Sequence, residues 1–535
     1  MSKIRLRPVS VACVSRWSGL IIATLLMVLA NIPIAPGHVV FDRALVFVLI
    51  MLSLSQLVSK RWLYGIALPV LTLVALDITL SCWTWLSFHS AFSYGFAQSV
   101  LDSNVDESLS MLGVYFRYVM LFIIVLAILL LSIIRTPRLT KRFRQTPVLL
   151  LFLLLAGFSI QAVIHQLRSN NLQSPLQRVL AATPVSNANV FLQVWQDSQI
   201  ITSVTTNPPQ YAPVTRDTGI DTYVLIIGES ERTANMHIYG YEWETTPELE
   251  AQRNHLLLFR HAVSGAPVTI MAVPLALTGD TPVQHNFQHY RDNIISVANQ
   301  AGFDTWWFSR QGTGGAHNNI IAAIASLAHH QQWVDQGYDD ALVPLLHHAL
   351  AHPGKKLIVL HLYGSHENAC DRYPHNVAVF PDENNPDGCY DNSVHFTDAL
   401  MGQVFRLLHD KHASVLYFSD HALVRDPVGD VMYHHAGTHP PHEAIQVPMF
   451  FWFSPQVATQ DSITGDQQPL WSTVNNNRLM EEWMGITRQG EQPESIRDYL
   501  QQHSGHADVM DTTGHVFDWK ELPALSVELG RNKHQ

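Results

Sequence analysis

Basic residues and cysteines are both scarce in this sequence of 535 residues. Lys and Arg number 33 against 44 Asp and Glu, which gives a formal net charge of −11. General binding of nucleic acid needs a basic surface, so this balance argues against that class of protein. Of the four cysteines, Cys370 and Cys389 lie close together in a polar stretch. They could form one disulfide in an exported domain, and two free thiols are the alternative.

Long hydrophobic runs are nearly absent after residue 165, whereas they dominate the chain before it. The segments that could each cross a bilayer are 19–36, 44–58, 62–86, 114–134 and 147–164. The first could instead be a signal peptide, but four further spans favour an uncleaved anchor. We therefore expect a five-helix transmembrane domain over 1–165, periplasmic interfacial helices and a linker over 166–219, and a catalytic domain over 220–535.

The distribution of Lys and Arg orients this anchor. The leader and the second and fourth connections together hold eleven of these residues, whereas the first and third connections hold one, Arg43. The N-terminus is therefore expected in the cytoplasm. An odd number of spans then puts the rest of the chain in the periplasm of a Gram-negative cell. Asp77, inside the third run, is either a functional intramembrane carboxylate or a residue at a water-filled edge.

Short, β-rich apolar runs alternate with helix-compatible stretches in the soluble part. The runs are 223–227, 305–309, 357–362, 415–419 and 449–453. This alternation predicts an α/β domain whose mostly parallel sheet is covered by helices on both faces. Ligands bind beyond the carboxyl ends of the strands in such sheets. The residues that follow the strands are therefore the first candidates for a site.

Residue types that bind metals follow two of these strands. Glu229 comes after the first strand, and Asp420-His421 comes after a later one. The two groups can converge at one end of the sheet, and their oxygen and nitrogen ligands suit zinc or a similar divalent ion. Taken alone, each fragment is equally compatible with an ordinary turn.

Thr269 is the candidate nucleophile. Pro267 could open a helix and would place Thr269 in its first turn, where free backbone N–H groups attract a phosphate. Metal coordination would activate the hydroxyl. Without the metal residues, a packed helix-start residue would be the simpler interpretation.

Nearby imidazoles could bind a second ion, protonate a leaving oxygen or hold a phosphate. These candidates are His366, His434, His435, His439 and His442.

Together these motifs resemble the phosphoethanolamine transferases of Gram-negative inner membranes, which belong to the alkaline phosphatase/sulfatase superfamily. Gly228-Glu229-Ser230-Glu231-Arg232 is similar to the family's Gly-Glu-Ser/Thr-x-Arg. Thr269 aligns with the nucleophilic Thr of the family, and Asp420-His421 aligns with its metal-binding pair. The resemblance covers nearly the whole chain. It implies a five-helix anchor followed by a periplasmic domain with the fold of that superfamily.

The resemblance also implies a reaction. Thr269 would take phosphoethanolamine from phosphatidylethanolamine, a lipid of the same membrane, as a covalent phosphothreonine. It would then pass the group to lipopolysaccharide core, lipid A or a periplasmic glucan. Zinc, with a second ion as an option, would be held by Glu229, Thr269, Asp420 and His421. His366 and His434 or His435 would be catalytic. The substrate would be bound by Gln311, His317 and Arg232.

The sequence departs from the lipid A enzymes on the acceptor side. Gly265 and Leu275 stand where many of them have cysteines, Ala422 begins a different continuation of the Asp-His motif, and Gly315 stands at the position of a family Lys. The alternatives are a phosphoglycerol transferase or sulfatase-like phosphohydrolase with the same anchor, and a non-catalytic membrane scaffold. A Thr nucleophile argues against a sulfatase, and the complete set of metal residues argues against the scaffold.

Overall fold

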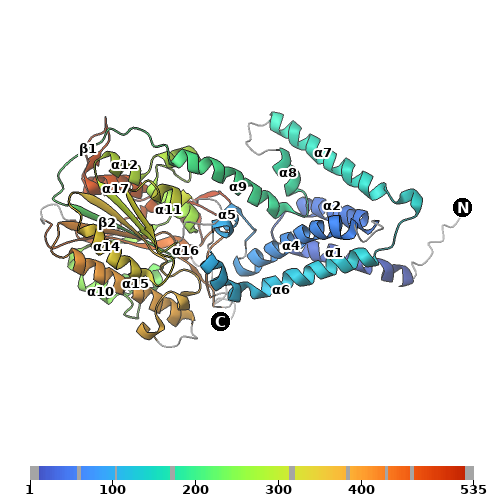
Figure 1. Ribbon diagram of the computed structural model, residues 1–535, viewed down its shortest axis with the longest axis horizontal. Helices are drawn as coiled ribbons and strands as arrows, with labels where there is room; N and C mark the ends of the chain where they lie inside the picture. The colour runs from blue at the N-terminus through green and yellow to red at the C-terminus, as the bar shows by residue number, and fades with distance from the viewer. Residues whose placement is uncertain are drawn as a thin grey trace. The chain divides into compact units, whose positions relative to one another are not determined.

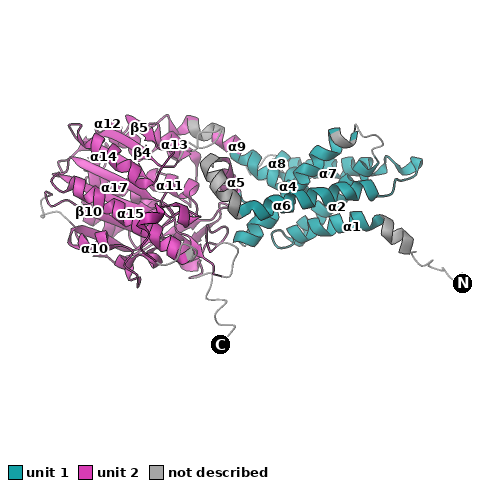
Figure 2. Cartoon of the chain, turned by 60° about the horizontal axis from the view of Figure 1, so that its bottom comes forward, with its two compact units in different colours: residues 1–93, 112–194 teal, residues 94–111, 195–535 magenta. Residues whose placement is uncertain are grey.

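The computed structural model describes the chain in ranges separated by short gaps. These ranges are 11–56, 62–88, 90–102, 105–168, 175–311, 320–380, 386–427, 432–457 and 463–524. The chain forms two compact units (Figure 2). The first comprises residues 1–93 and 112–194, and the second comprises residues 94–111 and 195–535. The domain boundaries expected after residues 165 and 219 remain a prediction.

The first unit is built from long apolar helices. They are α1 (Val11–Asn31), α2 (Gly37–Ser55), α4 (Leu68–Phe88) with a π-helical turn before it (Leu63–Ala67), most of α6 (Val105–Arg135), α7 (Thr146–Arg168), α8 (Pro175–Ala181) and the start of α9 (Ser186–Thr205).

Within the described residues, four segments are long and apolar enough to cross a membrane, and a fifth apolar helix, Trp17–Asn31, is shorter. The four are Gly37–Ser55, Gly65–Phe88, Tyr115–Arg135 and Lys141–Ile164. They fit an N-terminal membrane anchor.

Asp77 has a structural partner inside this unit. It is buried in α4, and its Oδ1 accepts a hydrogen bond from the backbone N–H of Asn187 at 2.7 Å. The Asn187 side chain in turn donates to the Asp77 carbonyl oxygen at 3.0 Å. Because Asn187 lies in the first turn of α9, the carboxylate binds a helix N-terminus, where a negative charge is stabilising.

The second unit contains a nine-stranded sheet with the order β11-β3-β10-β7-β2-β6-β4-β5, and β12 also pairs with β3. Strands β7, β2, β6, β4 and β5 run parallel, while β10 is antiparallel to both its neighbours. The bounds are β2 (Thr222–Gly228), β3 (Leu256–Val263), β4 (Asp304–Ser309), β5 (His330–Trp333), β6 (Lys356–His361), β7 (Ala413–Ser419), β10 (Gln446–Phe453), β11 (Gly465–Gln467) and β12 (Trp471–Ser472).

Helices cover both faces of this sheet, as Figure 1 shows. Alternate side chains of β2 enter two separate cores: Tyr223, Leu225 and Ile227 on one face, and Val224 and Ile226 on the other. The first face packs against α11 (Thr269–Leu277), α12 (Ile294–Gln300), α13 (Ile320–Ala325) and α17 (Asn476–Met484), and the second against α10 (Pro247–Ala251), α14 (Val343–Leu350) and α15 (Pro386–Leu408). Burial on both faces explains why the strands are apolar throughout.

Smaller elements complete the second unit. They are the helices α16 (His442–Ile445) and α18 (Ile496–His503) and the strand pairs β1 (Val214–Thr215) with β13 (Ile486–Thr487), β8 (Val424–Arg425) with β9 (Tyr433–His434), and β14 (Asp508–Met510) with β15 (Val516–Asp518). Cys370 and Cys389 form a disulfide.

Helix α5 (Tyr94–Asp102) comes from the connection between the third and fourth predicted spans, yet it belongs to the second unit. The backbone N–H of Gly95 donates to the carbonyl of Thr512 at 3.1 Å. A Cβ at Gly95 would lie only 3.3 Å from Sδ of Met271 in α11. This close approach brings α5 onto the helix that begins with Thr269.

Candidate active site

Glu229 is the first residue after β2, and neighbouring backbone fixes its position. Its carbonyl accepts a hydrogen bond from the N–H of Ser365 at 2.9 Å. Gly364 has a φ of +49°, and a Cβ there would lie 2.5 Å from the Glu229 carbonyl oxygen. Only glycine suits both this close approach and this left-handed conformation.

The next residue, Ser230, has a φ of +61°, which is uncommon for a residue with a side chain. Its N–H donates to Oδ1 of Asp420 at 3.1 Å, and the N–H of His421 donates to the same oxygen at 2.7 Å. Asp420 therefore ties the turn after β2 to the turn after β7. Such an unfavourable backbone conformation persists only where its surroundings hold it, as they do here.

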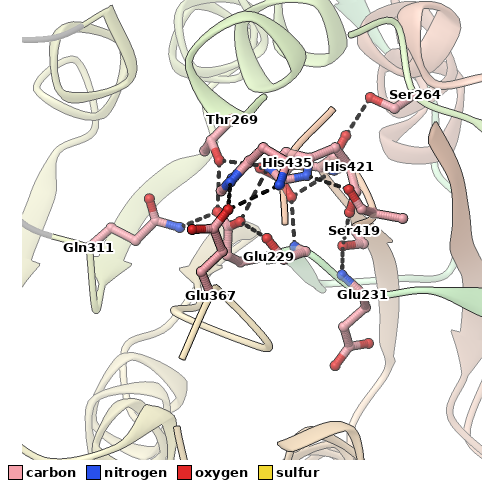
Figure 3. A network of polar contacts seen from close by, with 12 residues as sticks. Glu229, Glu231, Ser264, Thr269, Gln311, Glu367, Ser419, His421 and His435 are labelled. Atoms are coloured by element: carbon pink, nitrogen blue, oxygen red, sulfur yellow. Dashed lines mark hydrogen bonds and ion pairs between the residues drawn. The ribbon is translucent and has the colours of Figure 1, made fainter. Parts of the chain in front are cut away.

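The side chains of Glu229, Thr269 and His421 meet at the carboxyl edge of the sheet (Figure 3). Thr269 Oγ1 donates to Glu229 Oε2 at 2.9 Å and lies 3.1 Å from His421 Nε2. The helix begins at Thr269 itself, with Val268 as its N-cap residue, and not at Pro267 as expected. The reason is that Val268 is extended, so helical backbone starts only after it.

The residues at this point fit a divalent cation. One ligand atom each from Glu229, His421 and His435 lies within 4.8 Å of the others. Asp420 Oδ2 is buried 3.5 Å from His421 Nε2, and within the described part of the chain it accepts no hydrogen bond. His421 Nδ1 faces the carbonyl of Ala422 at 2.9 Å, which leaves Nε2 as the nitrogen for a metal. This set of oxygen and nitrogen donors is suited to zinc.

Burial sets the protonation of these groups. It raises the pKa of Glu229, with a further increase from the neighbouring Asp420, and it raises the pKa of Asp420 to about 6. It lowers the pKa of His421 and of His366 to about 4 each, so both imidazoles are neutral near pH 7. Neutral imidazole is the metal-binding form, and a cation would relieve the cost of two buried carboxylates.

His435, which is partly exposed, and the buried Glu367 form a pair beside this group. His435 Nδ1 lies 2.6 Å from Oε1 of Glu367, and the His435 ring lies 4.8 Å from that of His421. Burial lowers the pKa of His435, but Glu367 outweighs this effect and raises it to about 8. Burial likewise raises the pKa of Glu367, but His435 outweighs it and brings the value to about 2. The pair is therefore charged near neutral pH.

The other predicted site residues have different surroundings. Gln311 Nε2 donates to Glu229 Oε2 at 2.9 Å, and the His366 ring lies 5.3 Å from that of His435. His434 Nδ1 instead lies 2.8 Å from the carbonyl oxygen of His435. Of the two, His435 has a ring nitrogen close to Glu229 and His421, which together with Asp420 we call the metal group. Arg232 forms an ion pair with Glu443 at 2.8 Å. His317 lies outside the described residues.

Two residues of the site were missed from the sequence. Glu367 carried a weak signal, because it adjoins His366. Asp339 carried none, because it acts on residues far along the chain. Its carboxylate accepts hydrogen bonds from the N–H groups of Tyr363 at 2.9 Å and Gly364 at 2.8 Å, and so it supports the loop that carries Gly364 and His366.

Known proteins match both parts of the chain. A sulfatase family model matches residues 221–489, and a model of the transferase YhbX N-terminal domain matches residues 6–205. YhbX of Escherichia coli strain K12 is 39% identical over 516 residues, which cover 95% of this chain and 94% of that protein. The phosphoethanolamine transferase OpgE of the same strain is 34% identical over 225 residues, 40% of this chain and 42% of OpgE.

The chain belongs to the phosphoethanolamine transferase family of the alkaline phosphatase/sulfatase superfamily.

Solved structures of phosphoethanolamine transferases share its fold. The integral membrane lipooligosaccharide phosphoethanolamine transferase A of Neisseria meningitidis has a TM-score of 0.64 at 18% identity, covering 90% of this chain and 96% of that chain. The C-terminal periplasmic domain of Escherichia coli EptC in complex with Zn has a TM-score of 0.51 at 23% identity, covering 59% of this chain and 97% of that chain. The chain is thus a transferase with the fold of this family.

Proposed function

We propose that the protein transfers phosphoethanolamine from phosphatidylethanolamine to a glycan of the cell envelope, through a phosphothreonine at residue 269. One observation carries this proposal: the Thr269 hydroxyl stands at the first turn of α11, between Glu229 Oε2 and His421 Nε2. The helix N-terminus favours a phosphate beside the nucleophile. Family membership supplies phosphoethanolamine as the group transferred.

In the first half-reaction, Thr269 Oγ1 attacks the phosphorus and its proton passes to Glu229 Oε2, the acceptor of its hydrogen bond. The bond between phosphorus and the diacylglycerol oxygen breaks, and that oxygen leaves with a proton from the His435 imidazolium. In the second half-reaction, the acceptor hydroxyl gives its proton to neutral His435 and its oxygen attacks the phosphorus. Thr269 then leaves and regains its proton from Glu229. Glu229 and His435 therefore end in their starting protonation states.

Zinc would be held by Glu229, Thr269, Asp420 and His421, while His435 stays outside the ligand set as the imidazolium that protonates the leaving oxygen. When bound, it would lower the pKa of the Thr269 hydroxyl and offset the charge on the phosphoryl oxygens. The buried carboxylates of Glu229 and Asp420 beside His421 Nε2 support this assignment. So does the complex of the related EptC domain with Zn.

We also infer five spans, with α1 as the first, a cytoplasmic N-terminus and a periplasmic catalytic domain. A membrane anchor suits this chemistry, because the donor is itself a bilayer lipid. Labelling of single cysteines from outside intact cells tests this topology. A cysteine introduced at exposed Val214 should react with an impermeant reagent, whereas one introduced at Arg138, in the fourth connection, should not.

Mass spectrometry of the peptide that contains Thr269 tests the reaction directly. After incubation of the full-length protein with phosphatidylethanolamine, the peptide should carry a phosphoethanolamine adduct. Thr269→Ala should abolish the adduct, while Glu229, Asp420 and His421 still hold part of the metal. A phosphoglycerol adduct after incubation with mixed phospholipids, or no adduct, would overturn the proposal.

A further inference from the structure

A cavity of about 370 Å³ is lined by residues that lie close in sequence to the metal group. Arg232, which lines it, lies three residues after Glu229, and Arg425 lies four residues after His421. Arg425 pairs in register with Tyr433 on the β8–β9 hairpin, and His435 follows two residues later. One short hairpin therefore connects the wall of this cavity to the metal group.

The polar groups of this cavity are held in place. Asp391 is 4% exposed, and its two oxygens accept hydrogen bonds from Asn235 Nδ2 at 2.8 Å and from the Tyr241 hydroxyl at 2.9 Å. Asp387 accepts from Nε of Arg425 at 2.8 Å and from Nη2 at 2.5 Å. The walls thus offer fixed acceptors and a fixed guanidinium donor, which is the preorganisation that a specific binding site needs.

An aromatic wall stands beside these polar groups. Trp243 is 48% exposed and meets the ring of Phe380 edge-on, with centroids 6.2 Å apart. The N–H of Phe380 donates to Oδ1 of Asn392 at 3.0 Å, and the disulfide between Cys370 and Cys389 closes the loop that carries Phe380. A half-exposed Trp that packs against a residue of this disulfide-closed loop offers a flat surface to a ligand.

The charges of the cavity select among ligand classes. Asp387 neutralises Arg425, and Glu443 pairs with Nη2 of Arg232, whose Nε and Nη1 are buried away from solvent. A phosphate in the cavity would therefore meet one neutralised guanidinium and one buried guanidinium, with Glu242 and Asp391 nearby to repel it. An uncharged ring rich in hydroxyls matches these walls, because its C–H face packs on Trp243 while its hydroxyls donate to carboxylates and accept from Arg425.

We propose that this cavity binds a hexose unit of the acceptor glycan and holds the acceptor while Thr269 carries the transferred group. This role rests on the proposed function, whereas the binding of sugar can be measured without transfer. The glycan could be a periplasmic glucan or the core of lipopolysaccharide, since both present hexoses.

Calorimetry with the full-length protein in detergent tests the binding. The probes are a linear glucose oligosaccharide and deacylated core oligosaccharide, and the one that binds identifies the source of the hexose. Trp243→Ala should weaken binding about tenfold or more, as loss of a central aromatic contact does. Trp243→Phe should restore most of the affinity. The matched control is Trp195→Ala, which removes a second Trp that is 48% exposed and should leave binding unchanged.

Three results would overturn this assignment: neither oligosaccharide binds the wild type, Trp243→Ala binds as tightly as the wild type, or free phosphoethanolamine displaces the sugar in competition. Adduct formation at Thr269 is measured on the same samples. If Trp243→Ala forms the adduct normally but passes it to glycan more slowly, the sugar site is supported. If the wild type forms no adduct, the proposed function fails, and the sugar-binding result still decides the identity of the cavity.

Discussion

Glu367 Oε1 lies 2.6 Å from Nδ1 of His435 beside the metal group, with the Glu367 side chain 3% and the His435 side chain 16% exposed. The carboxylate fixes the ring so that its other nitrogen, Nε2, is available to the site. It also makes His435 an imidazolium below a pH of about 8.

Replacing Glu367 by Gln should therefore lower both activity and the pH at which activity is lost. Without the carboxylate, burial still lowers the pKa of His435 and only the weaker attraction of Glu229 and Asp420 opposes it, so this pKa should fall. We expect transfer to slow about 10- to 100-fold, with the alkaline limb of the pH–rate profile displaced to lower pH. Glu367→Asp should recover part of both effects. An unchanged profile in Glu367→Gln would refute the pairing as the cause.

Gly364→Ala should disorganise the site. The added Cβ would lie 2.5 Å from the carbonyl oxygen of Glu229, and the residue would retain a left-handed φ. The carbonyl is backbone and cannot rotate away, so we expect a loss of about 2–4 kcal/mol in unfolding free energy together with weaker metal binding. Gly354→Ala is the control, because Gly354 is also left-handed but has open space around its Cβ position. It should cost only about 1 kcal/mol and leave metal binding intact. Equal losses in both variants would show that the contact with Glu229 is unimportant.

The buried His361 should make the metal-free protein sensitive to acid. Burial lowers its pKa to about 3, whereas an unfolded histidine titrates near 6.5. Its contribution to stability is thus fully present above pH 6.5 and is lost as the pH falls toward 3. Over that window each pH unit removes about 1.4 kcal/mol of unfolding free energy, because only the unfolded chain takes up the proton.

Urea unfolding at several pH values between 6 and 4 measures this effect. His361→Gln should reduce the slope of unfolding free energy against pH by about 1.4 kcal/mol per unit. A Gln at the exposed His412 should keep the wild-type slope. The same slope in His361→Gln as in the wild type would mean that His361 is protonated in the folded state.

Removing the disulfide should destabilise the second unit. Cys370 and Cys389 are 19 residues apart, and closing a loop of that size stabilises a protein by about 3 kcal/mol through the unfolded chain. Replacing both by Ser should lower the thermal midpoint, and a reducing agent should lower the wild-type midpoint to the same value. Cys82→Ser, which changes a cysteine outside any disulfide, should leave the midpoint of this unit unchanged. A wild type indifferent to reduction would contradict the prediction.

The sequence predicted five strands of the nine-stranded sheet, namely β2, β4, β6, β7 and β10, but not β3, β5, β11 or β12. Apolar runs buried on both faces identify strands directly, and residues that follow parallel strands must meet at one edge of the sheet. Glu229 and Asp420 were predicted in this way, and the structure places them together. The sequence does not show that β10 is antiparallel to its neighbours, because an apolar run has the same pattern in either direction.

Pairings between distant residues could not be predicted. Asp339 supports a loop 24 residues away, and Asp77 binds Asn187 from 110 residues away. Neither carboxylate has a local pattern that reveals its partner. The choice between His434 and His435 was also open. Adjacent residues at the end of a strand point to different sides, and the register of the two-residue strand β9 cannot be derived from its residue types.

The inclusion of α5 in the second unit affects how the protein can be divided. A fragment that starts at residue 195 would lack the helix whose Gly95 contacts Thr512 and approaches Met271. It would expose to water the apolar side of α11 that this helix covers, next to the nucleophile. Such a fragment should self-associate more readily than the full chain. Transfer rates measured on it would come from a protein in which α11 no longer packs against α5.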